Sequence, residues 1–234
     1  MKILALDTAA SICAAAVYDS ERDCVVAQVS EDIGKGHAEV LMDYIERALD
    51  AAKLSMRDMD RVAVNVGPGS FTGVRIGVSA ARGFALGLGR PAIGIDAFEA
   101  LAREAADQCA ARPVTVLLDA HRGEIYAQGF DADLRPRTKP LVLSREEAEA
   151  LVHDLPEETV LAGSAVASIK ASVSGFFELG SIAPTAGIAT YARLAAQRVP
   201  GEAPKPLYMR GPDVKPQTGF ALPRKPVGAG GGMR

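Results

Sequence analysis

Two aspartates stand where carboxylate chemistry is possible. Asp7 and Asp119 each follow a short apolar run, and they lie about half the chain apart. Carboxylates at strand ends can hold metal ions and activate water, as in nucleases and ATPases. The turn after Asp7, residues 8–11, contains no glycine, so it would form a weak cradle for phosphate. Spacing assigns no further carboxylate to either position, and the alternative is that both aspartates only cap turns.

A glycine-rich loop, residues 67–73 (GPGSFTG), separates a strand pattern from a helix pattern. Backbone N–H groups and a helix N-terminus in this position could bind an anion. The loop fits neither the P-loop nor the dinucleotide motif, because Thr72 stands where each requires a glycine. The alternative is that the glycines form a tight turn and let the helix approach a neighbour closely. The candidate anion or nucleotide contacts are Gly67, Gly69, Ser70, Thr72 and Arg75.

The histidines and cysteines are isolated in the sequence. No two histidines have metal-binding spacing, and the cysteines form no C-x-x-C pair. No nucleophile elbow is present, and neither Ser70 nor Thr72 has a base signalled nearby. We therefore predict no catalytic residue, no metal ligand and no disulfide, which fits a reducing cytoplasm. The residues concerned are His37, His121, His153, Cys13, Cys24 and Cys109.

Composition restricts the class of protein. The 234 residues are 48% hydrophobic and 24% charged, as in an ordinary globular protein, and the net charge is −3. This charge argues against a protein that neutralises nucleic-acid phosphates by itself, so any RNA contact would be local or through a partner. The apolar run in residues 1–7 is too short for a signal peptide or a membrane span and predicts a buried strand.

The elements that position these residues occur in two similar halves. The first half reads as a three-strand meander followed by helix, strand, helix, strand and helix, and the second half opens with the same strand pattern. Strands are predicted at 3–6, 12–18, 25–29, 62–66, 92–95, 114–118, 124–130 and 159–162, and helices at 37–53, 74–88, 97–106, 144–153 and 186–198.

This duplication predicts an α/β protein of the actin-like ATPase (ASKHA) fold, with two ribonuclease-H-like lobes that contain mixed sheets. The expected divisions are a first lobe at 1–103, a second, degenerate lobe at 104–222 and a flexible, glycine-rich tail at 223–234.

The helices at 37–53 and 74–88 have more apolar or small residues than one neighbour can cover. Side by side they could offer a surface to a partner chain, whereas the alternative is packing within the domain. We expect Leu49 to lie near the outer side of its helix together with Ala38 and Met42. The candidate interface residues are His37, Ala38, Met42, Leu49, Val74, Gly77 and Ala81.

Several blocks of the chain resemble one bacterial family. The most specific is GPGSFTGVRIG at 67–77, which continues in AARGFA at 80–85. Further similar blocks are ILALDT at 3–8, GHAE at 36–39, IDAFEAL at 95–101, DAHRGEIY at 119–126 and PLYMR at 206–210. On these blocks, which span nearly the whole chain, the sequence is similar to the TsaB family of threonylcarbamoyladenosine biosynthesis proteins. His121 and Met209 depart from residues that the family commonly has, which are arginine and an aliphatic residue.

The resemblance implies a role in placing threonylcarbamoyl on the adenosine next to the tRNA anticodon. It implies a non-catalytic subunit that dimerises with its paralogue TsaD through the two helices of the first half and activates it, with TsaE as the ATP-hydrolysing third member. TsaD carries two metal-binding histidines in the segment similar to 97–101, where this chain has Ala97 and Leu101. The resemblance therefore implies that this chain binds no cofactor of its own and that ATP and metal are bound by the partner subunits. It also implies that this chain reaches tRNA only through the complex.

Two rival functions stay open. One is an enzyme of the same superfamily acting alone, a metallopeptidase or an ATPase that uses Asp7 and Asp119, although the older family label of glycoprotein endopeptidase gains no support from these residues. The other is a homo-oligomeric scaffold in which the same helices pair with themselves. Whether the glycine loop binds a nucleotide at a subunit boundary, and whether Arg75 or Arg82 touches tRNA, also stays open.

Overall fold

The computed structural model describes residues 1–172 and 176–210. The predicted tail at 223–234 lies outside the described residues, as does the predicted end of the second lobe at 222. Among the helices of the described part, none is long and apolar enough to cross a membrane.

The first sheet contains five strands in the order β3-β2-β1-β4-β5. The first three form the predicted antiparallel meander, and β4 and β5 continue the sheet parallel to β1. The central strands are buried on both faces, which explains why they read as continuous apolar runs. The strands are β1 (Lys2–Asp7), β2 (Ile12–Asp19), β3 (Cys24–Asp32), β4 (Arg61–Asn65) and β5 (Ala92–Ile95).

The second sheet repeats this arrangement with four strands in the order β8-β7-β6-β9. Its β6 pairs antiparallel with β7 and parallel with β9, as β1 pairs with β2 and β4. The strands are β6 (Val114–Asp119), β7 (Glu124–Phe130), β8 (Leu141–Ser144) and β9 (Val160–Ala162). The repeated topology confirms the predicted actin-like ATPase fold with two ribonuclease-H-like lobes.

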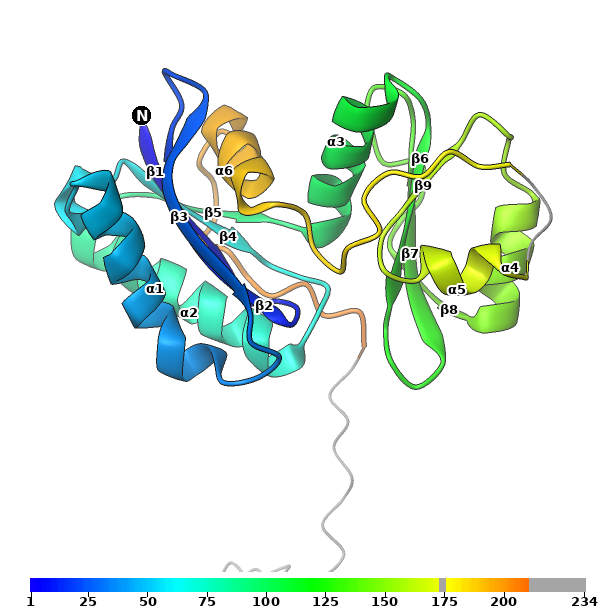
Figure 1. Ribbon diagram of the computed structural model, residues 1–234, viewed down its shortest axis with the longest axis horizontal. Helices are drawn as coiled ribbons and strands as arrows, with labels where there is room; N and C mark the ends of the chain where they lie inside the picture. Colours follow the sequence, from blue (N-terminus) through cyan, green and yellow to red (C-terminus); the bar gives the residue numbers. More distant parts are fainter. Residues whose placement is uncertain (173–175, 211–234) are drawn as a thin grey trace, which may run out of the picture.

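The helices cover the sheets in layers (Figure 1). The helices α1 (His37–Ala52) and α2 (Phe71–Leu88) cover one face of the first sheet, and α4 (Arg145–His153) and α5 (Val166–Lys170) cover the far face of the second. Between the sheets lie α3 (Ala97–Cys109) and α6 (Ile188–Gln197). A short 3-10 turn, η1 (Met56–Asp58), follows α1.

The two lobes exchange helices. Although α3 follows the strands of the first sheet in sequence, it packs on β6 and β9, whereas α6 from the second half packs on β1 and β2. Phe98, Leu101 and Tyr191 are fully buried in the core that both helices share with both sheets. The predicted division between residues 103 and 104 falls inside α3, because one apolar core joins the halves at this point.

Candidate functional site

Asp7 is enclosed in a polar network where β1 and β4 end. Its carboxylate accepts hydrogen bonds from the Ala9 N–H at 2.9 Å, the Asn65 amide at 3.0 Å and the Thr185 hydroxyl at 2.5 Å. The Tyr191 hydroxyl closes the network, at 2.9 Å from the Asn65 amide and 2.7 Å from the Thr185 hydroxyl. Burial raises the pKa of the Asp7 carboxyl above its ordinary value, and the hydrogen bonds that it accepts act against this shift.

This network ties the halves of the chain together, because Thr185 and Tyr191 come from the segment that returns to the first sheet. The Asp7 side chain is 1% exposed and does not line the cleft between the lobes. Asp119, in contrast, is exposed and lines that cleft, with its carboxylate 2.7 Å from the His121 N–H. The structure therefore does not bring the two aspartates together as a pair that faces one ligand.

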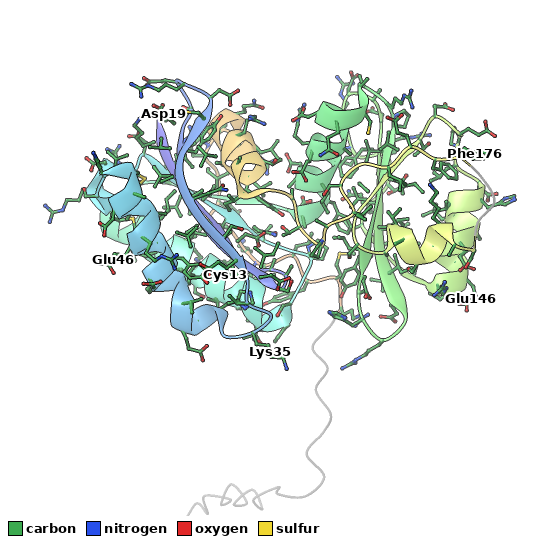
Figure 2. All side chains as sticks on the ribbon, in the orientation of Figure 1. Cys13, Asp19, Lys35, Glu46, Glu146 and Phe176 are labelled. Atoms are coloured by element: carbon green, nitrogen blue, oxygen red, sulfur yellow. The ribbon has the colours of Figure 1, made fainter. Side chains whose placement is uncertain are left out.

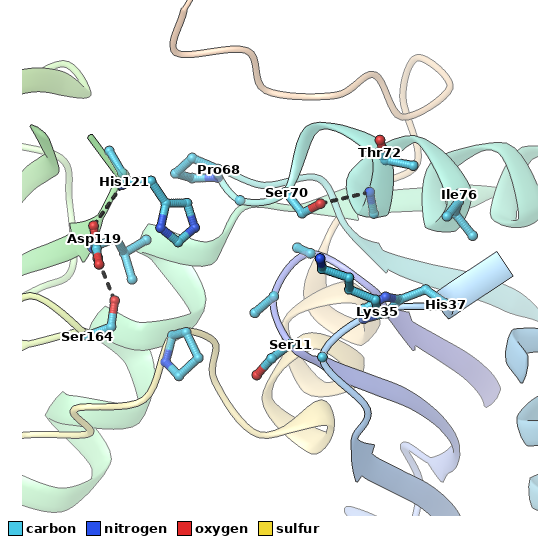
Figure 3. Close-up of a pocket in the computed structure, with 18 of the residues that line it drawn as sticks. Ser11, Lys35, His37, Pro68, Ser70, Thr72, Ile76, Asp119, His121 and Ser164 are labelled. Atoms are coloured by element: carbon cyan, nitrogen blue, oxygen red, sulfur yellow. Dashed lines mark hydrogen bonds between the residues drawn. The ribbon is translucent and has the colours of Figure 1, made fainter. Parts of the chain in front are cut away.

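The cleft itself has a volume of about 800 Å³ (Figure 3). Asp119, His121 and Ser164 lie on the side of the second lobe, and the Ser164 hydroxyl accepts a hydrogen bond from the Asp119 N–H at 3.0 Å. Lys35, His37 and Ser11 lie opposite, and Ser70, Thr72 and Ile76 of α2 complete the wall. Within the described residues, no group of three or more His, Cys, Asp or Glu side chains is arranged to hold a metal ion.

The glycine loop packs tightly against the turn after Asp7. A Cβ atom on Gly69 would lie 2.2 Å from the Ala9 carbonyl oxygen, and one on Gly73 would lie 2.0 Å from that of Thr8. The Ser70 N–H donates to the Ala9 carbonyl at 2.7 Å, and the Thr8 hydroxyl donates to the Gly73 carbonyl at 2.6 Å. Close approach thus accounts for these glycines, as the alternative interpretation of the loop proposed.

The glycine loop and the turn after Asp7 touch one another, with no room for a Cβ atom between them. Both segments also line the cleft between the lobes. The α2 N-terminus is capped by the Ser70 hydroxyl, which accepts from the Gly73 N–H at 3.2 Å, and Gly67 donates to the Asn65 side chain. Thr72 is exposed at the cleft, and the anion contact expected of this loop stays a prediction.

A second cavity of about 800 Å³ adjoins the first at residues 68–70. Arg75 stands at its edge, with its guanidinium 3.7 Å from the Phe71 ring centroid and its Nε donating to the Tyr208 hydroxyl at 2.7 Å. The sequence pattern singled out Arg75 but neither aromatic residue. Phe71 was hidden within the glycine motif, and Tyr208 stands in a segment with no regular period to signal its partner.

The predicted interface residues divide into two sets. Ala38 and Met42 are exposed on α1, but the other five are buried within the chain: His37, Leu49, Val74, Gly77 and Ala81. Leu49 was expected to lie outward like Ala38 and Met42, but it is only 8% exposed and belongs to the apolar core of the first lobe, at the point where that core meets the cavity between α1 and α2. The His37 ring nitrogen Nε2 lies 3.3 Å from the Ile12 carbonyl, so this side chain makes a hydrogen bond within the chain. Ala97 and Leu101 are also fully buried.

The outer side of α1 and α2 carries exposed apolar and small residues beside charged ones. A cavity of about 340 Å³ lies between the helices, and Glu46 at its rim points outward (Figure 2). Met42 is 50% exposed and Leu86 of α2 is 85% exposed. A Cβ atom on Gly83 or Gly87 would meet no atom of the described chain within 4 Å. The apolar lining residues are Met42, Ile45, Leu49, Leu54, Met56 and Phe84.

Comparison with known proteins gives a match to a TsaD family profile and matches to individual TsaB proteins. The profile of the family described as "TsaD: tRNA N6-adenosine threonylcarbamoyltransferase" matches residues 27–139. The chain is 35% identical over 133 residues to the tRNA threonylcarbamoyladenosine biosynthesis protein TsaB of Escherichia coli (strain K12), which covers 57% of this chain and 56% of that protein. It is 33% identical over 150 residues to TsaB of Buchnera aphidicola subsp. Schizaphis graminum, covering 64% and 68%. The match thus spans between about half and two thirds of these relatives.

Solved structures agree with the fold. A crystal structure from Pseudomonas aeruginosa, described as an uncharacterized protein with similarity to peptidase YEAZ, has a TM-score of 0.75 at 24% identity and covers 89% of this chain and 99% of that chain. A YeaZ structure from the same organism has a TM-score of 0.69 at 24% identity, covering 84% and 92%.

Proposed function

Because the chain belongs to the TsaB family of tRNA threonylcarbamoyladenosine biosynthesis proteins, we propose that it is the non-catalytic subunit that dimerises with TsaD and activates it. The reaction served is the transfer of threonylcarbamoyl to the adenosine next to the tRNA anticodon. TsaE is the third member of the complex in this proposal. ATP and metal belong to the partner subunits, and the complex works in the cytoplasm.

The observation that carries the proposal is the outer face of α1 and α2, which we name the helix-pair face and define by Ala38, Met42, Gly83, Leu86 and Gly87. Glycine in an exposed helix costs about 1 kcal/mol relative to alanine, and at Gly83 no contact within the described chain requires it. Small residues let the backbone of another helix approach closely. Together with the exposed Met42 and Leu86, the two glycines favour a partner helix on this face.

The absence of turnover in this chain is supported by the state of its candidate catalytic residues. Asp7 is held by three hydrogen bonds inside the protein. Asp119 lines the cleft, but Asp7 does not. The positions similar to the metal-binding histidines of TsaD hold the buried side chains of Ala97 and Leu101. A general acid or base must reach the reacting group, and Asp7 cannot do so in this arrangement.

The test is size-exclusion chromatography with light scattering on the chain mixed with TsaD of its own organism, followed by a threonylcarbamoyl-transfer assay. We expect a mixed complex, little activity of TsaD alone, and no activity of this chain alone. Met42→Glu should abolish the complex because it places a charge on the helix-pair face. Leu141→Glu, at an apolar position on β8 that is also exposed (36%), is the control and should leave the complex intact.

Other results would contradict the proposal. ATP or peptide hydrolysis by the isolated chain that disappears in Asp119→Ala would support the enzyme of the same superfamily. Asp119 suits this test better than Asp7, because the exposed residue can be changed without opening the buried network. The helix-pair face could also pair with a second copy when TsaD is absent. Sedimentation of the chain alone at several concentrations would detect that homodimer, and added TsaD should dissolve it.

A further inference from the structure

The second cavity differs in charge from the rest of the molecule. Residues 1–210 contain 22 Lys and Arg against 28 Asp and Glu, so this part of the chain is acidic. The side chains that line the cavity nevertheless include Arg75, Arg122, Arg210 and His121, and no Asp or Glu is among the described lining residues. A basic cavity on an acidic protein attracts an anionic ligand locally.

Aromatic rings are gathered at the same place. Three of the seven Phe and five Tyr residues of the chain line this one cavity: Phe71, Tyr126 and Tyr208. Phe71 is 50% exposed and Tyr208 is 48% exposed, with their ring centroids 5.4 Å apart. Exposed rings beside basic groups are the composition of surfaces that stack unpaired bases and hold the phosphates between them.

Arg75 is held in place at the edge of the cavity. Its guanidinium lies over the Phe71 ring, 3.7 Å from that centroid, and 5.5 Å from the Tyr208 centroid. Its Nε donates a hydrogen bond to the Tyr208 hydroxyl. Among the described residues, Arg75 makes no ion pair with a carboxylate. A guanidinium that is fixed in orientation and uncompensated in charge can bind a phosphate without ordering a long side chain.

Arg210 fixes the opposite wall. Its Nη2 donates to the Ala120 carbonyl at 3.1 Å and pairs with Glu124, and its guanidinium lies 5.5 Å from the Tyr126 centroid. It thereby holds the β6–β7 turn, in which His121 and Arg122 have left-handed backbones with φ of 60° and 58°.

We propose that this cavity binds unpaired nucleotides of an RNA, with bases stacked on Phe71 and Tyr208 and a phosphate on Arg75. An acidic peptide would use the arginines but would leave the exposed rings without a matching surface, so the aromatic residues favour RNA. The inference rests on the proposed function in taking tRNA as that RNA, and it goes beyond it because this chain would then contact the substrate directly.

The test measures the affinity of the full chain, alone and mixed with TsaD, for a fluorescently labelled tRNA anticodon stem-loop. Phe71→Ala should weaken binding roughly 5- to 150-fold, the range for losing one base stack, whereas Phe71→Trp should retain it. Arg75→Ala should weaken binding and lower the salt dependence by about one counterion. Arg82→Ala is the matched control, because Arg82 is exposed on the same helix but does not line the cavity.

Four outcomes would overturn the proposal. They are equal affinity of Phe71→Ala and the Arg82 control, no measurable binding by the wild type, displacement of the RNA by polyglutamate at equal charge concentration, and binding of ATP but not of RNA. Folding of each variant is checked by thermal denaturation. Failure here is distinct from failure of the proposed function, because Met42→Glu tests binding to TsaD on another face of the molecule and leaves the cavity unchanged.

Discussion

Replacing Gly83 by alanine should have opposite effects on the isolated chain and on the complex. Gly83 lies inside α2, and a Cβ atom there meets nothing within 4 Å. Alanine is better than glycine in a helix interior by about 1 kcal/mol, so the free energy of unfolding should rise by about that amount. For a chain of this length the melting temperature should rise by roughly 2–4 °C.

In the complex the same methyl group would occupy space that a partner helix needs. Overpacking a close helix contact costs about 1–3 kcal/mol, which corresponds to a dissociation constant for TsaD roughly 5- to 150-fold higher. Gly77→Ala is the control within the same helix. Its Cβ would lie 2.6 Å from the Thr8 hydroxyl oxygen, so this variant should lower the melting temperature instead.

The assay is thermal denaturation of the isolated variants together with a calorimetric titration of each with TsaD. A Gly83→Ala chain that melts higher and binds TsaD as tightly as the wild type would refute the placement of the partner on α2. A Gly83→Ala chain that melts lower than the wild type would refute the premise that the space beside this glycine is open.

Four further predictions concern other parts of the molecule. Leu49→Glu should prevent folding, because it buries an unpaired charge in the core, whereas Met42→Glu should fold normally; circular dichroism separates the two. Asp7→Ala should lower the free energy of unfolding by about 1–3 kcal/mol or more, because it leaves buried donors without an acceptor, whereas Asp7→Asn keeps an acceptor and should cost less in urea denaturation. The pKa of Asp7 is raised in the folded state, so the folded chain keeps this proton at pH values where the unfolded chain has lost it. The contribution of Asp7 to the free energy of unfolding should therefore fall as pH rises through its folded-state pKa. The difference in stability between wild type and Asp7→Asn, measured from pH 4 upward, should show that slope, and a constant difference would contradict it. Arg210→Ala should increase hydrogen exchange in the β6–β7 turn, because the Ala120 and His121 carbonyls lose their guanidinium donor, and unchanged exchange there would show that the turn is held by other contacts.

Much of the fold follows from local patterns in the sequence. Helix α1 was predicted from its apolar period, and the capping box of Ser144 and Glu147 that begins α4 is confirmed. The strand β8 and the helix α5 were not predicted, because each is only four or five residues long and takes its stability from packing on its neighbours. The helix exchange between the lobes was also not predictable, since no local pattern says which sheet α3 or α6 covers.

The candidate site was predictable in its residues but not in its geometry. The loop glycines and Arg75 were identified from type and spacing, yet the partners that decide their roles are remote in sequence: Thr8 for Gly73, and Tyr208 for Arg75. The same holds for Asp7, whose burial depends on Thr185 in the returning segment. Helical period alone placed Leu49 outward, because it could not register that Leu54 and Met56, which follow α1, pack against the same apolar core.

The packing of the glycine loop relates the turn after Asp7 to the helix-pair face. The Ala9 carbonyl accepts a hydrogen bond from the Ser70 N–H, and the Thr8 hydroxyl donates one to the Gly73 carbonyl. These contacts set the position of α2. Since a helix moves as a rigid unit, the same contacts position Arg75 at the cavity and Gly83 at the helix-pair face. A substitution at Gly73 should thus impair TsaD binding two or more turns away, because the loop holds the helix in position.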